Sequence, residues 1–280
     1  MEHHYRELAP GPALHGVAAS LWVQRVDGTA EPYAHRTVPH GGAEIACAVG
    51  APARALGPLS RPRSDALAPG TTVVGVRVRP GAAPLVFDAP AHALLDGAVE
   101  LRALWGADAD ALADAVAAAP DAAGAVAALE RALARRLVAR HGRAERDPLV
   151  AEAVRRLGPW PAARVQSLPA GLGISERQLR RRCHASVGVG PKALQRILRF
   201  QGFLALTHRG DWGADGLARA AADAGFADQA HLTRESLELS GATPAALLRD
   251  AREHCRGRHD HGATHRPLLI DRAQHLGLPR

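Results

Sequence analysis

Four polar side chains crowd one short segment near the C-terminus, GFADQAHLTRESLELSGATP. They are Gln229, His231, Thr233 and Arg234, and the apolar residue among them is Leu232. Glutamine can form two hydrogen bonds with adenine, arginine can form two with guanine, and a threonine methyl can pack on thymine. Each residue alone is more typical of a solvated helix face, but the group has the chemistry needed to read base edges.

A second copy of this arrangement lies 53 residues earlier in the chain. Ser175, Leu179, Arg181, Gly188, Pro191 and Leu194 align with Asp228, Leu232, Arg234, Gly241, Pro244 and Leu247. Each copy predicts a turn, an N-cap acceptor, about ten helical residues, a terminating glycine and a proline that opens the next helix. The first helix offers Arg177, Arg180 and Arg181, while Leu179 and Leu232 are expected to point inward.

A short helix of small residues should precede each copy, within LPAGLGIS and LARAAADAGFAD. A helix, a tight glycine turn and a capped second helix make the helix-turn-helix arrangement, whose second helix enters the major groove. Pro169 and Gly171 interrupt the first of the preceding helices, and a proline inside a helix clashes one turn back. The first unit is therefore expected to be kinked.

The positive charge of the chain is confined to its C-terminal part. Residues 1–157 hold 17 Arg and Lys against 17 Asp and Glu, whereas residues 158–280 hold 18 against 11, which accounts for the net charge of +7. Lys192 is the one lysine, so almost all the basic side chains are arginines, whose planar guanidinium groups can donate two parallel hydrogen bonds. A localised positive field favours a polyanionic partner, although solvated basic faces are also common.

The N-terminal part has the pattern of a small antiparallel sheet or barrel. Short β-type runs stand between Gly and Pro turn signals: SLWVQRV, AEIACAV, TTVVGVRVRP and APLVFDAP. Apolar residues then recur at helical spacing from Asp108, and Asp147-Pro148 is a good helix start that runs to Gly158. The fold class is therefore α+β: an N-terminal β sheet or barrel, a helical connector and a C-terminal all-α domain with two helix-turn-helix units.

The domain boundaries follow from these changes of pattern. They are a β-rich sensing or dimerisation domain over 1–106, a helical connector over 107–157, the double helix-turn-helix domain over 158–250 and a basic, histidine-rich tail over 251–280. The tail is expected to be disordered. Neither a signal peptide nor a membrane span is indicated, so the protein is expected to be cytoplasmic.

The two C-terminal copies resemble the paired helix-turn-helix domain of AraC/XylS-type transcriptional regulators. The segments SERQLRRRCHASVGVGP and AAADAGFADQAHLTRESLELSGATP carry the resemblance, and GFADQAHLTRE is the most specific part of it. The likeness covers about residues 158–250. More loosely, LHGVAASLWV, RTVPHGGAEI, VVGVRVRPGAAP and LWG look like the N-terminal domain of an actinobacterial subgroup of these regulators.

The resemblance implies one chain that reads two successive major grooves of double-stranded DNA. It assigns base contacts to Arg177, Arg180, Arg181, Gln229, His231, Thr233 and Arg234, and phosphate contacts to Ser175, Arg182, Arg199 and Asp228. It also implies a monomer or homodimer without catalytic activity or cofactor, with RNA polymerase as a partner and a small-molecule effector at the N-terminal domain. The chain departs from the family at Cys183 and Ser236, where a core Phe is usual, so the second unit is expected to pack loosely.

An enzyme is the alternative class. A β-barrel could hold a metal ion through His40, Glu44 and His92, with the helices serving as a DNA-binding module, but no HxH pair accompanies them. Cys183 could be a nucleophile, although a buried thiol is the simpler interpretation. The tail, with His254, Cys255, His259, His261 and His265, could bind zinc or nickel. A disordered, basic tail is the simpler interpretation of this tract, so no metal is predicted.

Overall fold

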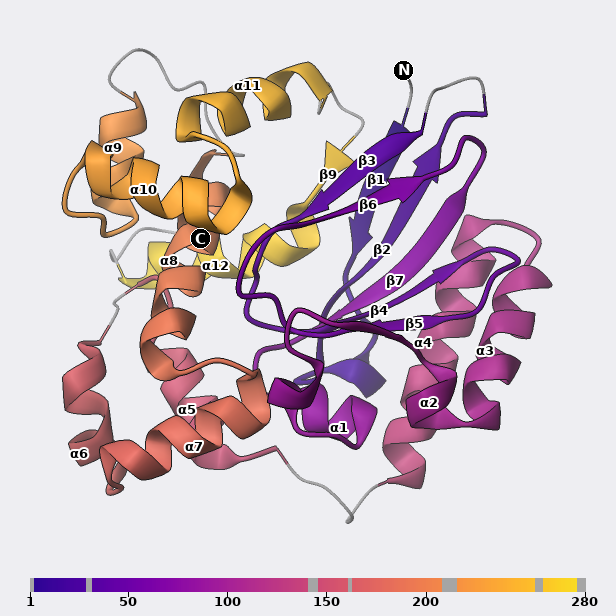
Figure 1. Cartoon of the computed structure of the whole chain (residues 1–280), viewed down its shortest axis with the longest axis horizontal. Helices are drawn as coiled ribbons and strands as arrows, with labels where there is room; N and C mark the ends of the chain where they lie inside the picture. The colour runs from indigo at the N-terminus through magenta and orange to yellow at the C-terminus, as the bar shows by residue number, and fades with distance from the viewer. Residues whose placement is uncertain are drawn as a thin grey trace.

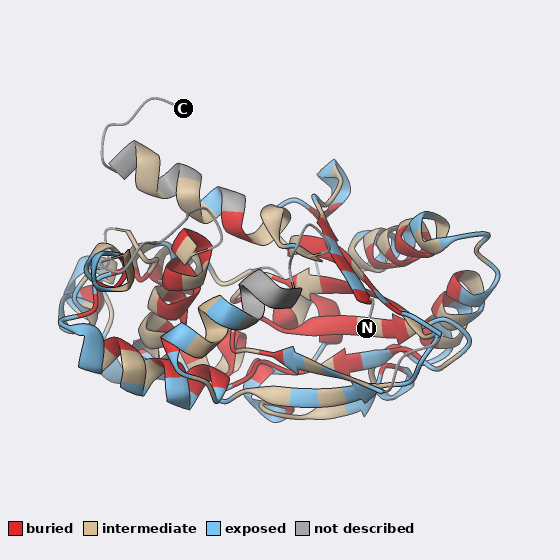
Figure 2. Cartoon of the chain, turned by 90° about the horizontal axis from the view of Figure 1, so that it is seen from above, coloured by how far each residue is buried: buried red, intermediate tan, exposed pale blue. Residues whose placement is uncertain are grey.

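The computed structural model has a sheet-containing N-terminal half and a helical C-terminal half (Figure 1). It describes residues 3–28, 32–140, 146–160, 163–207, 216–254 and 259–275. Buried residues run through the middle of both halves, as Figure 2 shows. The predicted α+β architecture is confirmed.

The N-terminal half is built on a seven-stranded sheet of order β8-β5-β4-β7-β2-β1-β9, beside a two-stranded sheet of β3 and β6. The strands are β1 (His3–Leu8), β2 (Ala18–Val26), β3 (Tyr33–Thr37), β4 (Glu44–Ala48), β5 (Arg54–Leu56), β6 (Arg63–Leu67), β7 (Thr72–Val78), β8 (Ala98–Glu100) and β9 (His259–Asp260). All the pairs are antiparallel except β1 with β9. Three of the predicted runs form the central strands β2, β4 and β7.

The fourth predicted strand, APLVFDAP, is wrong, because its residues form helix α1 (Ala83–Phe87). Pro84 lies in the first turn, where a backbone N–H has no helical partner to lose. Asp88 then ends the helix in the left-handed conformation (φ 57°), and its N–H donates to the Pro84 carbonyl at 3.1 Å. A short apolar run fits a buried helix as well as a buried strand, so the spacing alone could not decide.

Helices α3 (Ala107–Ala117) and α4 (Ala122–Ala139) pack against each other, and α4 lies on the sheet (Figure 1). Asp121 caps α4 by accepting from the Gly124 N–H at 2.8 Å. The preceding α2 (Arg102–Trp105) buries Trp105, whose Nε1 donates to the Val86 carbonyl at 2.8 Å. Helices α3 and α4 confirm the prediction that helices follow the sheet.

The C-terminal half is helical except for β9. Its helices are α5 (Pro148–Arg156), α6 (Leu168–Leu172), α7 (Glu176–Val187), α8 (Pro191–Thr207), α9 (Gly216–Asp223), α10 (Gln229–Ser240), α11 (Pro244–His254) and α12 (Gly262–His275). Asp147 caps α5 as predicted, because its Oδ1 accepts from the Leu149 N–H at 3.0 Å. However, Val150, Ala153 and Leu157 are buried in the C-terminal core, so α5 belongs with that domain and not with the connector.

The repeat has a direct structural counterpart. Helices α7 and α10 both have 12 residues and begin 53 positions apart. Each ends at a glycine in the left-handed conformation, Gly188 at φ 90° and Gly241 at φ 71°, which a residue with a Cβ rarely adopts. Pro191 and Pro244 then open α8 and α11.

The expectation of a disordered tail is wrong for residues 259–275. They form strand β9, which pairs with β1, and helix α12, which packs along α8. Basic and histidine-rich composition suggested a solvated tail, but the backbone of β9 gains hydrogen bonds at an open sheet edge and Leu269 packs on the C-terminal core. Cys255 lies outside the described residues.

Candidate nucleic-acid interface

The first helix-turn-helix unit consists of α6, a turn at Gly173 and α7. Ser175 caps α7 in a reciprocal pair: its Oγ accepts from the Gln178 N–H at 3.2 Å, and the Gln178 Oε1 accepts from the Ser175 N–H at 2.8 Å. The expected kink is absent. Pro169 lies in the first turn of α6, after a short 3-10 helix (Val165–Ser167), where its missing N–H costs nothing.

The second unit consists of α9, a turn at Gly225 and α10. Asp228 caps α10, since its Oδ1 accepts from the His231 N–H at 2.6 Å. Ala220 and Ala221 are buried, and their small side chains let α9 lie close to its neighbours. Trp160 holds the end of α9 through an Nε1 hydrogen bond of 2.8 Å to the Asp223 carbonyl.

The predicted base-reading residues of α7 lie on its exposed side. Arg177, Arg180 and Arg181 are exposed, whereas Leu179 is buried in the core, as the spacing predicts. In the part of the chain that the structure describes, these three guanidinium groups form no hydrogen bond or ion pair with another residue. Their donors are therefore directed at solvent.

On α10, the four candidates divide into two kinds. Gln229 and Arg234 are exposed and, among the described residues, make no side-chain hydrogen bond. His231 is half-buried: its Nδ1 accepts from the Ala227 N–H at 3.3 Å, and its ring lies 5.4 Å from the Phe226 ring. The Thr233 hydroxyl donates to the Gln229 carbonyl at 2.8 Å, which leaves its methyl group for other contacts.

The candidate phosphate contacts are partly engaged within the chain. Ser175 and Asp228 act as helix caps. Arg182 Nη1 donates to Asp147 Oδ2 at 2.6 Å, and the Arg199 guanidinium lies 5.7 Å from the centre of the Phe226 ring. Nothing in the sequence indicates the Arg182 pair, because its partner Asp147, the N-cap residue of α5, is 35 residues away.

The connecting helix α8 fixes the second unit in place. Arg196 Nε donates to both Glu235 oxygens, at 3.0 and 2.8 Å, and its Nη2 pairs with Glu238. Gly188, at the end of α7, lies against Pro58 and the Ala91 carbonyl of the N-terminal half. Helix α8 contacts both α7 and α10, so it joins the two candidate reading helices.

Ser236 stands where a core Phe is usual in the family that the sequence resembles. It is fully buried, and its hydroxyl donates to the Ala242 carbonyl at 2.7 Å. Ser240 donates to the Ser236 carbonyl, also at 2.7 Å. Two serines therefore tie the end of α10 to the following turn, which replaces aromatic packing by hydrogen bonds.

Cys183 is fully buried in the C-terminal core. Burial, together with the nearby charge of Asp147, raises the pKa of its thiol to about 11. The thiol is then protonated at neutral pH, so the cysteine lacks the thiolate that a nucleophile needs.

A buried ionic cluster lies within the N-terminal half, in place of the metal centre considered from the sequence. Arg77 Nε donates to Glu44 at 2.9 Å and its Nη1 donates to Glu7 at 3.0 Å. His40 Nε2 lies 3.1 Å from Glu44. Within the described residues, no group of three or more His, Cys, Asp or Glu side chains is placed to hold a metal ion.

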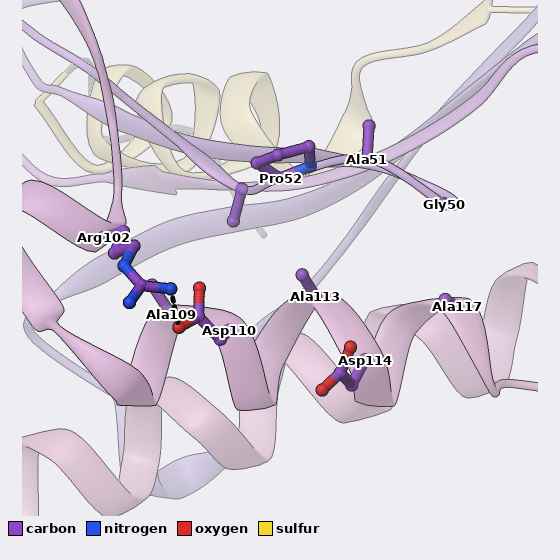
Figure 3. Close-up of a pocket in the computed structure, with 10 residues that line it drawn as sticks. Gly50, Ala51, Pro52, Arg102, Ala109, Asp110, Ala113, Asp114 and Ala117 are labelled. Carbon is purple, nitrogen blue, oxygen red and sulfur yellow. Dashed lines mark hydrogen bonds and ion pairs between the residues drawn. The ribbon is translucent and has the colours of Figure 1, made fainter.

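Two hollows adjoin the sheet. One of about 450 Å³ lies between β3, α8 and the C-terminal segment, and is lined by Tyr5, His35, Arg77 and Gln201 among others. The other, of about 300 Å³, lies between the Gly50–Ala53 turn and α3, with the Arg102–Asp110 pair at its wall (Figure 3). The first is the better candidate for a ligand, because hydrogen-bonding rings line it and two parts of the molecule meet there.

No helix in the described part of the chain is long and apolar enough to cross a lipid bilayer.

Two protein families match parts of the chain. Residues 168–250 match a helix-turn-helix domain, and residues 6–100 match a domain of unknown function (DUF6597). No curated protein is similar to the chain.

Among solved structures, the chain is similar to ToxT from Vibrio cholerae. An apo form is 12% identical with a TM-score of 0.48, and the match covers 86% of this chain and 99% of that one. A wild-type form bound to an unsaturated fatty acid is 11% identical with a TM-score of 0.42, covering 93% and 97%.

Proposed function

We propose that the chain is a DNA-binding transcriptional regulator of the AraC/XylS type, and that its helix-turn-helix domain at residues 168–250 reads two successive major grooves with α7 and α10. The observation that carries the proposal is the repeat. Helices α7 and α10 are equal in length, are both capped, pack on one core and carry exposed arginine and glutamine side chains. Bound side by side on one face of DNA, they would contact grooves about 34 Å apart.

The side chains with unused donors are the best candidates for base contacts. These are Arg177, Arg180, Arg181, Gln229 and Arg234. We propose that His231 and the Thr233 methyl contribute less to base recognition, because the His231 Nδ1 and the Thr233 hydroxyl already have partners in the chain. Phosphate contacts at the N-termini of α7 and α10, and from Arg182 and Arg199, complete the proposal.

The proposal is tested by mapping bound DNA and then footprinting the chain on a bound site. Two protected segments one helical turn apart are expected. Affinity should also fall more than about tenfold between ~50 and ~200 mM salt, because phosphate contacts release counterions. A single protected segment, or a flat salt dependence, would contradict the two-groove mode.

Arg234→Ala is expected to weaken binding to the specific site by about 1–3 kcal/mol and to relax base preference there. Arg131→Ala is the matched control, since it removes an arginine that is also exposed, from α4 in the N-terminal half. Binding to specific and random DNA should be measured for both variants. An equal loss on the two DNAs would show that Arg234 contacts phosphate and not a base.

We also propose that a small-molecule effector binds in the 450 Å³ hollow and that the protein has no catalytic activity. The hollow is shared by the sheet and by α8, so a ligand there would touch both halves. Such a ligand could favour the arrangement that engages the operator and RNA polymerase. The alternative, a metal-dependent enzyme, predicts stoichiometric metal in the purified protein, which a metal assay would detect.

A further inference from the structure

Residues 259–275, β9 and α12, lie beyond both regions that match known families. We call them the C-terminal clasp. The clasp contacts the sheet with one end and the second helix-turn-helix unit with the other, so it bridges the two halves (Figure 1). Each end has its own set of specific contacts.

At the sheet end, the clasp extends the open edge and supplies partners to the buried ionic cluster. Strand β9 pairs in parallel with β1, with Tyr5 opposite His259. The Thr264 N–H donates to Glu7 Oε2 at 2.8 Å, and the Thr264 hydroxyl accepts from Arg77 Nη1 at 3.1 Å. The Glu7 side chain is fully buried, so this N–H satisfies a carboxylate oxygen that water does not reach.

At the other end, α12 packs along α8 and reaches α9. Arg272 Nη2 donates to Asp223 Oδ2 at 2.8 Å, and both side chains are partly buried. Asp223 is the last residue of α9, two positions before the Gly225 turn. The clasp therefore contacts α9, the supporting helix of the second unit, next to the turn that precedes α10.

We propose that the C-terminal clasp couples the sheet to the second helix-turn-helix unit. Thr264 and Arg272 belong to the same helix, about 12 Å apart along its axis, with Pro267 between them, so a displacement at one contact can be transmitted through α12 to the other. The clasp also supplies His259, His261 and His265 to the wall of the 450 Å³ hollow. In this respect the proposal rests on the proposed function, since an effector in the hollow would bear on the clasp.

The coupling is tested by hydrogen exchange on the full chain, with one variant at each end. Arg272→Ala removes the grip on α9, and the amides of β1, at the far end of the clasp, should exchange at least about fivefold faster. Thr264→Val removes the hydroxyl at the sheet end, and the amides of α9 and α10 should respond in the same way. Arg102→Ala, which breaks an exposed ion pair in the N-terminal half, is the control and should change neither region.

If each substitution changed amide exchange rates only at its own end of the clasp, the proposal would be overturned. Circular dichroism at the exchange temperature shows whether each variant is folded. If Arg272→Ala unfolds, Arg272→Lys, which keeps the charge but loses the planar fork, replaces it and should give a smaller acceleration in β1.

The exchange result does not depend on DNA, so it separates the clasp from the proposed function. Arg272→Ala should also weaken specific DNA binding about fivefold, because α10 would have to be ordered on binding. Coupled exchange without any DNA binding by the unmodified chain would retain the clasp and refute the regulator. Normal DNA binding by the unmodified chain, together with exchange effects confined to the mutated end, would support the regulator and refute the coupling through the clasp.

Discussion

Replacing Arg77 by methionine should lower the free energy of unfolding by about 3–5 kcal/mol, because it leaves buried carboxylates without their shared cation. The Glu7 side chain is fully buried and that of Glu44 is 5% exposed. Arg77 also donates to Thr264, so the substitution removes a contact of the C-terminal clasp. Methionine fills a similar volume, which limits the loss from packing.

The effect of Arg77→Met should depend on pH. Burial alone raises the pKa of Glu44, but the charge of Arg77 and the hydrogen bond from His40 outweigh it and bring the pKa down to about 2. A carboxyl whose pKa is lower in the folded state stabilises the fold above its unfolded pKa, and this contribution is lost as the pH falls. The difference between the variant and the unmodified chain should therefore be largest near neutral pH and shrink between about pH 4.5 and 2.

Arg79→Met is the matched control. Arg79 lies two residues further along the chain, and its Nε donates to the Ala18 carbonyl at 2.9 Å, with no carboxylate partner among the described residues. Its loss should cost about 1 kcal/mol with little pH dependence. Denaturant unfolding at neutral and acid pH measures both variants. Equal losses at both pH values would refute the role of Arg77 as a counter-ion.

Helices α7 and α10 could be predicted because their signals are local. The caps Ser175 and Asp228, the terminating glycines and the buried Leu179 and Leu232 all lie within one helix length, so spacing alone fixes the pattern. Repetition made the prediction stronger, because the same local signals occur twice. The exposure of the flanking arginines followed from the same periodicity.

The ionic cluster could not be predicted, because its members are far apart in the chain. Glu7, Glu44, Arg77 and Thr264 come together only when β1, β4 and β7 join one sheet and the tail returns to its edge. In the sequence, Glu44 stands out only as a possible metal ligand, and Glu7, Arg77 and Thr264 are ordinary polar residues in a strand or a tail. The order of residues 259–275 could not be predicted for the same reason, because the composition of the tail carries no information about the open strand edge that it covers.

Errors in the C-terminal half came from inferring packing from residue type. Ser236 replaces an aromatic residue, and size alone predicts a cavity there. The structure shows that a second serine, Ser240, lies one turn later and that both hydroxyls donate to the Ala242 carbonyl, which residue size alone does not predict. Helix α5 was separated from its domain at a Gly-Pro signal, although its apolar face packs beyond that signal.

Leu232→Ala and Leu179→Ala form a matched pair that should disable the two reading helices one at a time. Both leucines are buried, with exposed fractions of 0% and 1%, and they occupy equivalent positions in the repeat. Removing the side chain costs about 3 kcal/mol or more through lost burial and the cavity that remains. The cost falls mainly on the local unit, since each leucine anchors its own helix to the core.

Footprints of the two variants on one bound DNA should then be complementary. Leu232→Ala should lose protection over the segment that α10 contacts and keep the other, and Leu179→Ala should show the opposite pattern. Loss of both segments in both variants would mean that the two units unfold together, and the helices would not be separate reading elements.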